Sequence, residues 1–334
     1  MNHGLMDQIA ALHWIQECIG AFGGDPGSVT LLGHGTGAAC IQFLMVSAAV
    51  VPGLFHRAIL MSGSALSSWA SVSTPAHYAL QFGFALNCTG NLPSGLDIHD
   101  PELRPSSDEM DKMVNCLKNK PLDELNTVNI ESPRFLYAFG PSVDGIVIKN
   151  DYKSEIHRLG EDSRKEYELM FGVVPQESYN DLGEKDLRDG FDTERRDKIF
   201  RTLVRNVYDY HLNEVFISMI NEYTQWDRAN PFPIEIRDTA LSALSDARYV
   251  APLVCASKNL RSGQKNQFFY VFNHSSRNRE THVLNSATHG SELPYIFGAP
   301  LVTELGIFSG NWTPEDEMVS EAMLSYTTNF VKMG

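Results

Sequence analysis

The chain has 334 residues, of which 43% are hydrophobic and 20% are charged, and its formal net charge is −14. This composition is typical of a folded globular protein, and the acidic balance without a long basic run excludes a typical nucleic-acid-binding protein. The longest apolar run, residues 38–55, contains Gln42, Ser47 and Pro52 and is shorter than the roughly 20 residues that span a bilayer. We therefore expect a buried helix there, and neither a signal peptide nor a membrane span in this chain.

The N-terminal part alternates between helical and strand patterns. Residues 4–22 place apolar side chains at helical spacing, and residues 29–32 read as a buried strand. A glycine-rich turn at 33–37 follows, then an apolar helical run at 38–51 and a second strand at 57–61. Alternation of this kind predicts an α/β protein with a parallel sheet.

The later elements are predicted from the same patterns. We expect a surface loop at 90–112 and a charged, solvated excursion at 181–197. Strands are predicted at 167–174 and 267–272, helical regions at 198–226 and 239–262, and a C-terminal helix that begins at Thr313-Pro314.

The turn at 33–37 has the layout of a nucleophile elbow, G-x-S-x-G, between a strand and a helix. In that motif a serine stands at the apex and attacks the substrate. Here the apex is Gly35, which has no side chain. The sequence therefore predicts the scaffold of a hydrolase without its nucleophile.

Two other interpretations of the turn fail. The pattern Gly33-x-Gly35-x-x-Ala38 also fits a dinucleotide fingerprint, but that site needs an acid about 20 residues later to hold the ribose. No Asp or Glu occurs between Asp25 and Asp97, and no lysine follows the glycines as a phosphate loop requires. We therefore expect no nucleotide cofactor.

The cysteines and glycosylation sequons indicate the compartment. None of the five cysteines forms a C-x-x-C pair, so no metal site is expected. Cys88 and Cys116, if joined, would close a loop worth roughly 3–4 kcal/mol. Sequons begin at Asn87, Asn273 and Asn311. Together these features favour an extracellular protein.

Several phrases carry a family resemblance. Residues 7–16, 21–26, 28–33 and 57–64 resemble the type-B carboxylesterase and cholinesterase family. The resemblance implies an α/β-hydrolase fold, with a mostly parallel central sheet flanked by helices. It covers residues 1–334, which we expect to form a single domain, truncated at both ends relative to the family.

Within the family, the phrases at 64–70, 138–145, 289–298 and 326–330 resemble the neuroligins. That resemblance implies a cell-adhesion ectodomain on the synaptic surface, which binds a neurexin-type protein, with calcium as a candidate requirement. The segment after the family's triad acid would form the partner surface, here Tyr179, Asn180 and Asp181.

The family's catalytic residues carry over one by one. Its nucleophile falls on Gly35, its acid on Glu177 and its base on His289, while His34 takes the place of the acid that usually precedes the nucleophile. Acyl transfer needs all three roles, so the resemblance implies an inactive enzyme in which Glu177 and His289 remain as a structural pair.

The resemblance also implies a disulfide and a dimer. Cys88 and Cys116 match a family disulfide. A helix with Val215, Met219 and Tyr223 on one stripe resembles part of the four-helix bundle through which the family dimerises, although ordinary core packing explains such a stripe equally well.

Two alternatives stay open at this stage. The first is a hydrolase with residual activity, through Thr36 beside the apex or because Gly35 is a sequence error. The second is a non-catalytic carrier that holds a ligand in the former active-site gorge.

Overall fold

The structure is a computed structural model that describes residues 2–90, 106–159, 166–228, 230–259, 266–276, 286–302, 307–308 and 310–334. Its strands are β1 Thr30–His34, β2 Arg57–Met61, β3 Glu168–Val173 and β4 Gln267–Val271. Its helices are α1 His3–Cys18, α2 Thr36–Val46, α3 Pro75–Ala85, α4 Ser107–Lys118, α5 Leu122–Thr127, α6 Tyr152–Arg158, α7 Glu184–Asp189, α8 Thr193–Val207, α9 Leu212–Glu222, α10 Pro233–Ser245, α11 Ala251–Asn259, α12 Leu293–Ile296 and α13 Pro314–Met333.

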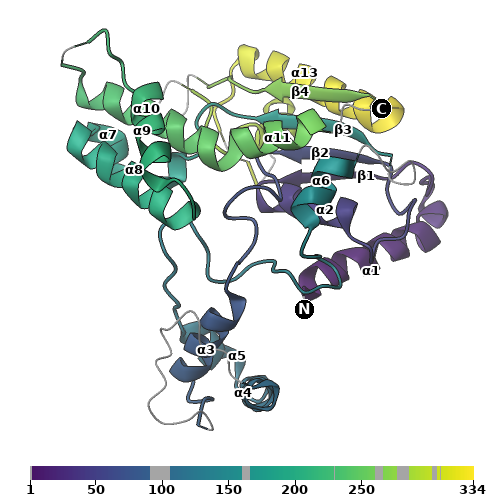
Figure 1. Cartoon of the computed structure of the whole chain (residues 1–334). Coiled ribbons are helices and arrows are strands. Elements are labelled where there is room, and N and C mark those ends of the chain that lie inside the picture. Colours follow the sequence, from purple (N-terminus) through teal and green to yellow (C-terminus); the bar gives the residue numbers. More distant parts are fainter. Residues whose placement is uncertain are drawn as a thin grey trace.

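The four strands form one parallel sheet in the order β1-β2-β3-β4 (Figure 1). Thr30 pairs with Arg57, and Arg57 in turn pairs with Glu168, so the first three strands start level. An ion pair of 2.5 Å between Arg57 Nε and Glu168 Oε2 reinforces this register. The strand ends that carry Gly35 and Glu177 therefore lie at the same edge of the sheet.

The side chains of β2 alternate between two cores. Ala58 and Leu60 face a large core shared with α1, α2, α6 and α11. Ile59 and Met61 face the opposite side, where Phe330 of α13 and Ile296 of α12 cover them. A strand buried on both faces explains the uninterrupted apolar run at this point of the sequence.

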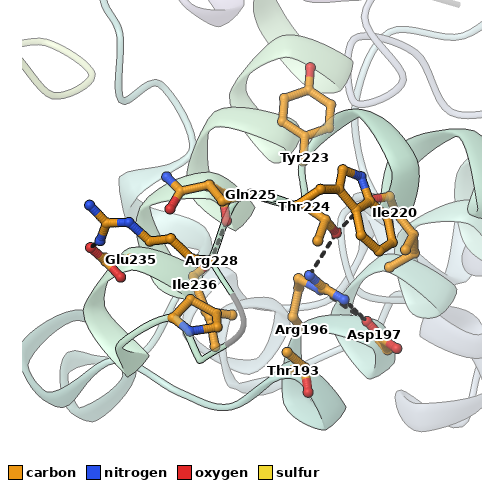
Figure 2. Close-up of a pocket in the computed structure, with 13 residues that line it drawn as sticks. Thr193, Arg196, Asp197, Ile220, Tyr223, Thr224, Gln225, Arg228, Glu235 and Ile236 are labelled. Carbon is orange, nitrogen blue, oxygen red and sulfur yellow. Dashed lines mark hydrogen bonds and ion pairs between the residues drawn. The ribbon is translucent and has the colours of Figure 1, made fainter.

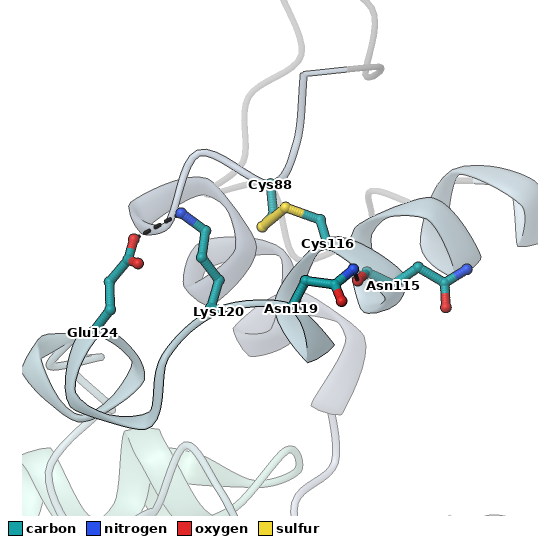
Figure 3. Close-up of a disulfide and its surroundings, with 6 residues drawn as sticks. All are labelled: Cys88, Asn115, Cys116, Asn119, Lys120 and Glu124. Carbon is teal, nitrogen blue, oxygen red and sulfur yellow. Dashed lines mark hydrogen bonds and ion pairs between the residues drawn. A yellow bond between two sulfur atoms is a disulfide. The ribbon is translucent and has the colours of Figure 1, made fainter.

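Two helical parts lie away from the sheet (Figure 1). Helices α7, α8 and α10 enclose a second core, which contains Phe200, Leu203, Leu241 and Leu244. Helices α3, α4 and α5 stand apart on long connections, and the Cys88–Cys116 disulfide joins the end of α3 to α4 (Figure 3). The predicted pairing of these two cysteines is therefore confirmed.

Three predicted elements need correction. Residues 91–105 of the loop predicted at 90–112 lie outside the described ranges, and the prediction is wrong from residue 107, because Ser106 and Glu109 form a capping box that starts α4. The excursion at 181–197 is also wrong, since it contains α7 and the first turn of α8. The helix predicted at 38–51 spans Thr36–Val46 instead.

The helical region predicted at 198–226 is two helices, α8 and α9, and the one predicted at 239–262 begins earlier, at Pro233, while its residues 260–262 lie outside the described ranges. The remaining predictions agree closely with the structure. The strand predicted at 57–61 is β2, and those at 167–174 and 267–272 contain β3 and β4. Thr313 caps α13 as predicted, by accepting a hydrogen bond from the backbone N–H of Asp316. Across the described ranges, none of the helices combines the length and apolar character that crossing a membrane requires.

Candidate functional site

The site begins at the turn between β1 and α2. Gly35 has φ 57° and ψ −116°, a conformation that side chains strongly disfavour. Its N–H donates to the carbonyl of Met61 at 2.8 Å, which holds the turn against the end of β2. A Cβ atom at Gly63 would lie 2.0 Å from the carbonyl oxygen of Gly35, so this close approach requires a second glycine. The elbow geometry is present.

The predicted acid and base meet beside this turn. A parallel bridge between Gln176 and Thr288 brings the two segments together. Glu177 Oε2 then lies 2.5 Å from His289 Nδ1, while its Oε1 accepts the N–H of Val174 at 2.9 Å. Glu177 is 1% exposed, so the carboxylate is fixed in position and orients the imidazole through Nδ1.

The other ring nitrogen of this histidine faces the apex. A Cβ atom at position 35 would lie 3.3 Å from Nε2 of His289. The structure thus brings together Gly35, Glu177 and His289, the three positions predicted from the sequence. The geometry has an oriented base and its acid, but glycine offers it no hydroxyl or thiol to deprotonate. Thr36, the neighbouring hydroxyl, is exposed in the first turn of α2.

A second buried carboxylate, which the sequence interpretation missed, pairs with His34 beside His289. Glu292 is 1% exposed, and its Oε1 lies 3.3 Å from His34 Nε2 and 3.3 Å from Ser62 Oγ. The rings of His34 and His289 are 4.4 Å apart, so two histidine–glutamate pairs stand side by side. The signal available in the sequence was an acid three residues after the base, followed by an apolar helix.

An aromatic side chain closes the other flank of this site. The ring of Tyr249 lies 5.1 Å from that of His289 and 5.3 Å from that of Trp69. Burial raises the pKa of Tyr249 well above its usual range, so its phenol stays neutral beside the imidazole. Tyr249 belongs to a π-helical turn, Asp246–Val250, a rare form that often occurs at functional sites.

The predicted partner surface is only partly available. Asn180 is exposed and Tyr179 is half-buried. Asp181 is an ion-pair partner of Arg248, whose side chain is 1% exposed, so this carboxylate anchors the segment from inside. The structure therefore leaves Asn180 as the most accessible member of the predicted set.

The predicted dimer stripe on α9 is partly internal. Met219 and Tyr223 pack against the second core, and the Tyr223 hydroxyl donates to Asp246 Oδ2 at 2.7 Å. Val215 is half-buried, and Ile217 on the same helix is 56% exposed. Core packing accounts for two of the three stripe residues.

The described residues contain no group of three or more histidine, cysteine or acidic side chains that could hold a metal ion. A cavity of about 460 Å³ lies between α8 and α10, away from the elbow (Figure 2). In this cavity, Arg196 Nη1 donates to Thr224 Oγ1 at 3.0 Å, and Arg228 pairs with Glu235.

The three glycosylation sequons are accessible, because Asn87, Asn273 and Asn311 are all exposed.

Comparison with known proteins identifies the family to which this chain belongs. The carboxylesterase family model matches residues 1–334. The chain belongs to the carboxylesterase family. This membership confirms the α/β-hydrolase fold class, and the four-stranded parallel sheet flanked by helices agrees with it.

Among curated proteins, this carboxylesterase-family chain is similar to neuroligins. It is 36% identical over 353 residues to Neuroligin-1 of Caenorhabditis elegans, with 100% of this chain and 42% of that protein covered. It is 37% identical to Neuroligin-3 and 34% identical to Neuroligin-2 of Homo sapiens, over 342 and 341 residues. Those matches cover 100% of this chain but only 37% and 38% of the two human proteins, so the chain spans about two fifths of its relatives.

Proposed function

We propose that residues 1–334 form one esterase-like domain of a cell-adhesion protein, which is catalytically inactive and binds a neurexin-type protein on an apposed cell. One observation carries the loss of catalysis. The oriented base His289 faces the apex of the elbow, and Gly35 stands at that apex. The similarity to neuroligins over the whole chain supports the adhesion role.

The loss of catalysis is tested by ester turnover. The chain and the variant His289→Ala are assayed side by side with p-nitrophenyl acetate. We expect the unmutated chain and His289→Ala to give the same background rate, because no nucleophile is present for the base to activate. Turnover by the unmutated chain that disappears in His289→Ala would establish the hydrolase alternative instead.

The partner is tested by surface plasmon resonance with a neurexin ectodomain, in calcium and in chelator. Asn180→Arg places a bulky cation on the exposed part of the predicted partner surface, and we expect it to weaken binding by about tenfold or more. Asn115→Arg makes the same change of charge at an exposed residue of α4 and is the matched control. If both variants bind the neurexin ectodomain with the same affinity, residues 179–181 do not form part of the interface.

The cell-surface location is tested by glycosylation. The exposed asparagines Asn87, Asn273 and Asn311 are proposed acceptors in a secreted or surface-displayed chain. Enzymatic removal of N-glycans should increase the electrophoretic mobility of the chain expressed through the secretory pathway. The increase should become smaller with each Asn→Gln replacement, and an unglycosylated secreted product would contradict the assignment of these sites.

A further inference from the structure

Helix α8 carries a local positive charge on a strongly acidic chain. Residues 193–207 contain five basic and two acidic side chains, whereas the whole chain has a net charge of −14. Salt at physiological strength screens charges beyond about 8 Å, so an approaching group experiences the local charge rather than the total. The outer face of α8 is therefore the place on this chain to look for an anion-binding site.

Two of these cations have no carboxylate partner within the part of the chain that the structure describes. Arg195, Arg196 and Lys198 each pair with a nearby acid, at 2.5, 2.8 and 2.7 Å. Arg201 and Arg205 are exposed and form no ion pair with any residue in the described ranges. They are four residues apart, so their side chains lie on the same face of the helix.

These two arginines line a groove of about 420 Å³ between α8 and the start of α9. Its other side chains include Lys198, the apolar Leu212 and Phe216, and no carboxylate is among the described residues that line it. The guanidinium of Arg201 lies 4.0 Å above the ring of Phe216. This cation–π contact holds the guanidinium at the wall of the groove.

The first turn of α9 forms the other wall of the groove. His211 precedes the helix in a left-handed conformation, with φ 50°, and its side chain does not cap the helix. The first helical residues, Leu212 and Asn213, also line the groove. The closest acid on this turn, Glu214, lies 3.5 Å from His211 Nδ1.

We propose that this groove binds an acidic peptide segment of a partner protein, with an apolar side chain of the segment against Leu212 and Phe216 and its carboxylates on Arg201 and Arg205. Charge complementarity selects an acidic ligand, and planar guanidinium groups suit carboxylates in bidentate geometry. The apolar Leu212 beside the two cations favours a peptide over a sulfated polysaccharide, because a peptide can place an apolar side chain next to its carboxylates.

The test is fluorescence anisotropy with the full chain and a labelled peptide, Asp-Glu-Phe-Leu-Glu-Asp. Arg201→Gln/Arg205→Gln should weaken binding about tenfold or more, since charge-assisted hydrogen bonds are lost. Lys153→Gln/Arg158→Gln removes two exposed cations from α6 and is the matched control, which should stay within about twofold. Thermal unfolding of both double variants verifies that they fold. The assay contains no neurexin, so its result is independent of the proposed function.

Three outcomes overturn the proposal. The first is equal binding by the groove variant and the α6 variant, which would indicate a diffuse electrostatic effect. The second is equal binding of the amide peptide Asn-Gln-Phe-Leu-Gln-Asn, which would exclude carboxylate recognition. The third is binding of a heparin fragment through Arg201 and Arg205 with no binding of the acidic peptide, which would assign the groove to a sulfated polysaccharide.

Discussion

Replacing Asp316 by alanine should destabilise this chain more than any surface change on α13. Asp316 is fully buried and accepts five hydrogen bonds. Tyr295 OH and His274 Nε2 each lie 2.7 Å from its Oδ1. Ser276 Oγ, Thr313 N and Thr313 Oγ1 lie 2.8, 2.8 and 2.7 Å from Oδ2. One carboxylate thus ties the segment after β4 to α12 and α13.

The magnitude follows from what alanine leaves behind. Tyr295 and Ser276 are buried, so their hydroxyls would lose an acceptor that water cannot readily replace. Breaking a buried charged network by removing one partner costs about 3–5 kcal/mol. At about 2 °C for each kcal/mol, the expected decrease in Tm is of order 6–10 °C.

Differential scanning calorimetry of the chain and its variants measures the change. The control is Glu317→Ala, an exposed acid in the same first turn, which should cost less than about 1 kcal/mol. A change of under about 1 kcal/mol for Asp316→Ala would refute the reasoning, since the cluster would then be replaceable by solvent.

The same carboxylate predicts a pH dependence. Burial by itself raises the pKa of Asp316, but hydrogen bonds from His274, Thr313 and Tyr295 outweigh burial and hold the pKa far below its usual range. A carboxyl whose pKa is lower in the folded state stabilises it fully above the unfolded pKa, near 4. This stabilisation is lost as the pH falls further, so the Tm difference between the chain and Asp316→Asn should shrink below about pH 4.

Three further changes follow from single contacts. Replacing Cys88 and Cys116 by serine removes a cross-link with a sequence separation of 28, and chain entropy predicts a loss of about 3–4 kcal/mol in urea unfolding, whereas no loss would contradict the pairing. Gly190→Ala should cost roughly 2–3 kcal/mol, because φ is 71° and a Cβ would lie 2.3 Å from the backbone of Pro233; an unchanged urea midpoint would refute this clash. Asp144 has a pKa of about 2, because backbone N–H bonds outweigh its burial. Asp144→Ala should cost about 2 kcal/mol at pH 7 and less near pH 2, as chevron or urea titrations at both pH values would reveal.

Local signals in the sequence predicted the elements around the elbow. The apolar run at 57–61 was predicted as a strand, which the structure confirms, and Thr313-Pro314 is a typical helix start that correctly predicted the beginning of α13. Where the prediction failed, polarity was the cause. The loop at 90–112 was inferred from polar residues, although Ser106 and Glu109 match the capping-box pattern that starts a helix. The many charged residues of α7 and α8 favour a loop when the sequence is read alone, and only the tertiary structure shows that one face of each helix is buried.

The sequence by itself determined the empty apex at Gly35, because a missing side chain needs no structure to be recognised. The family resemblance implied its two companions, Glu177 and His289. Only the tertiary structure decided how the other residues are used. Asp181 was predicted as a contact residue, a prediction that stays open, and the structure adds that it is the ion-pair partner of the buried Arg248. Glu292 pairs with His34 beside His289, and its position three residues after the base was too weak a signal to predict that contact. The physical reason is that burial and ion pairing depend on segments far apart in the chain, whose proximity local patterns do not encode.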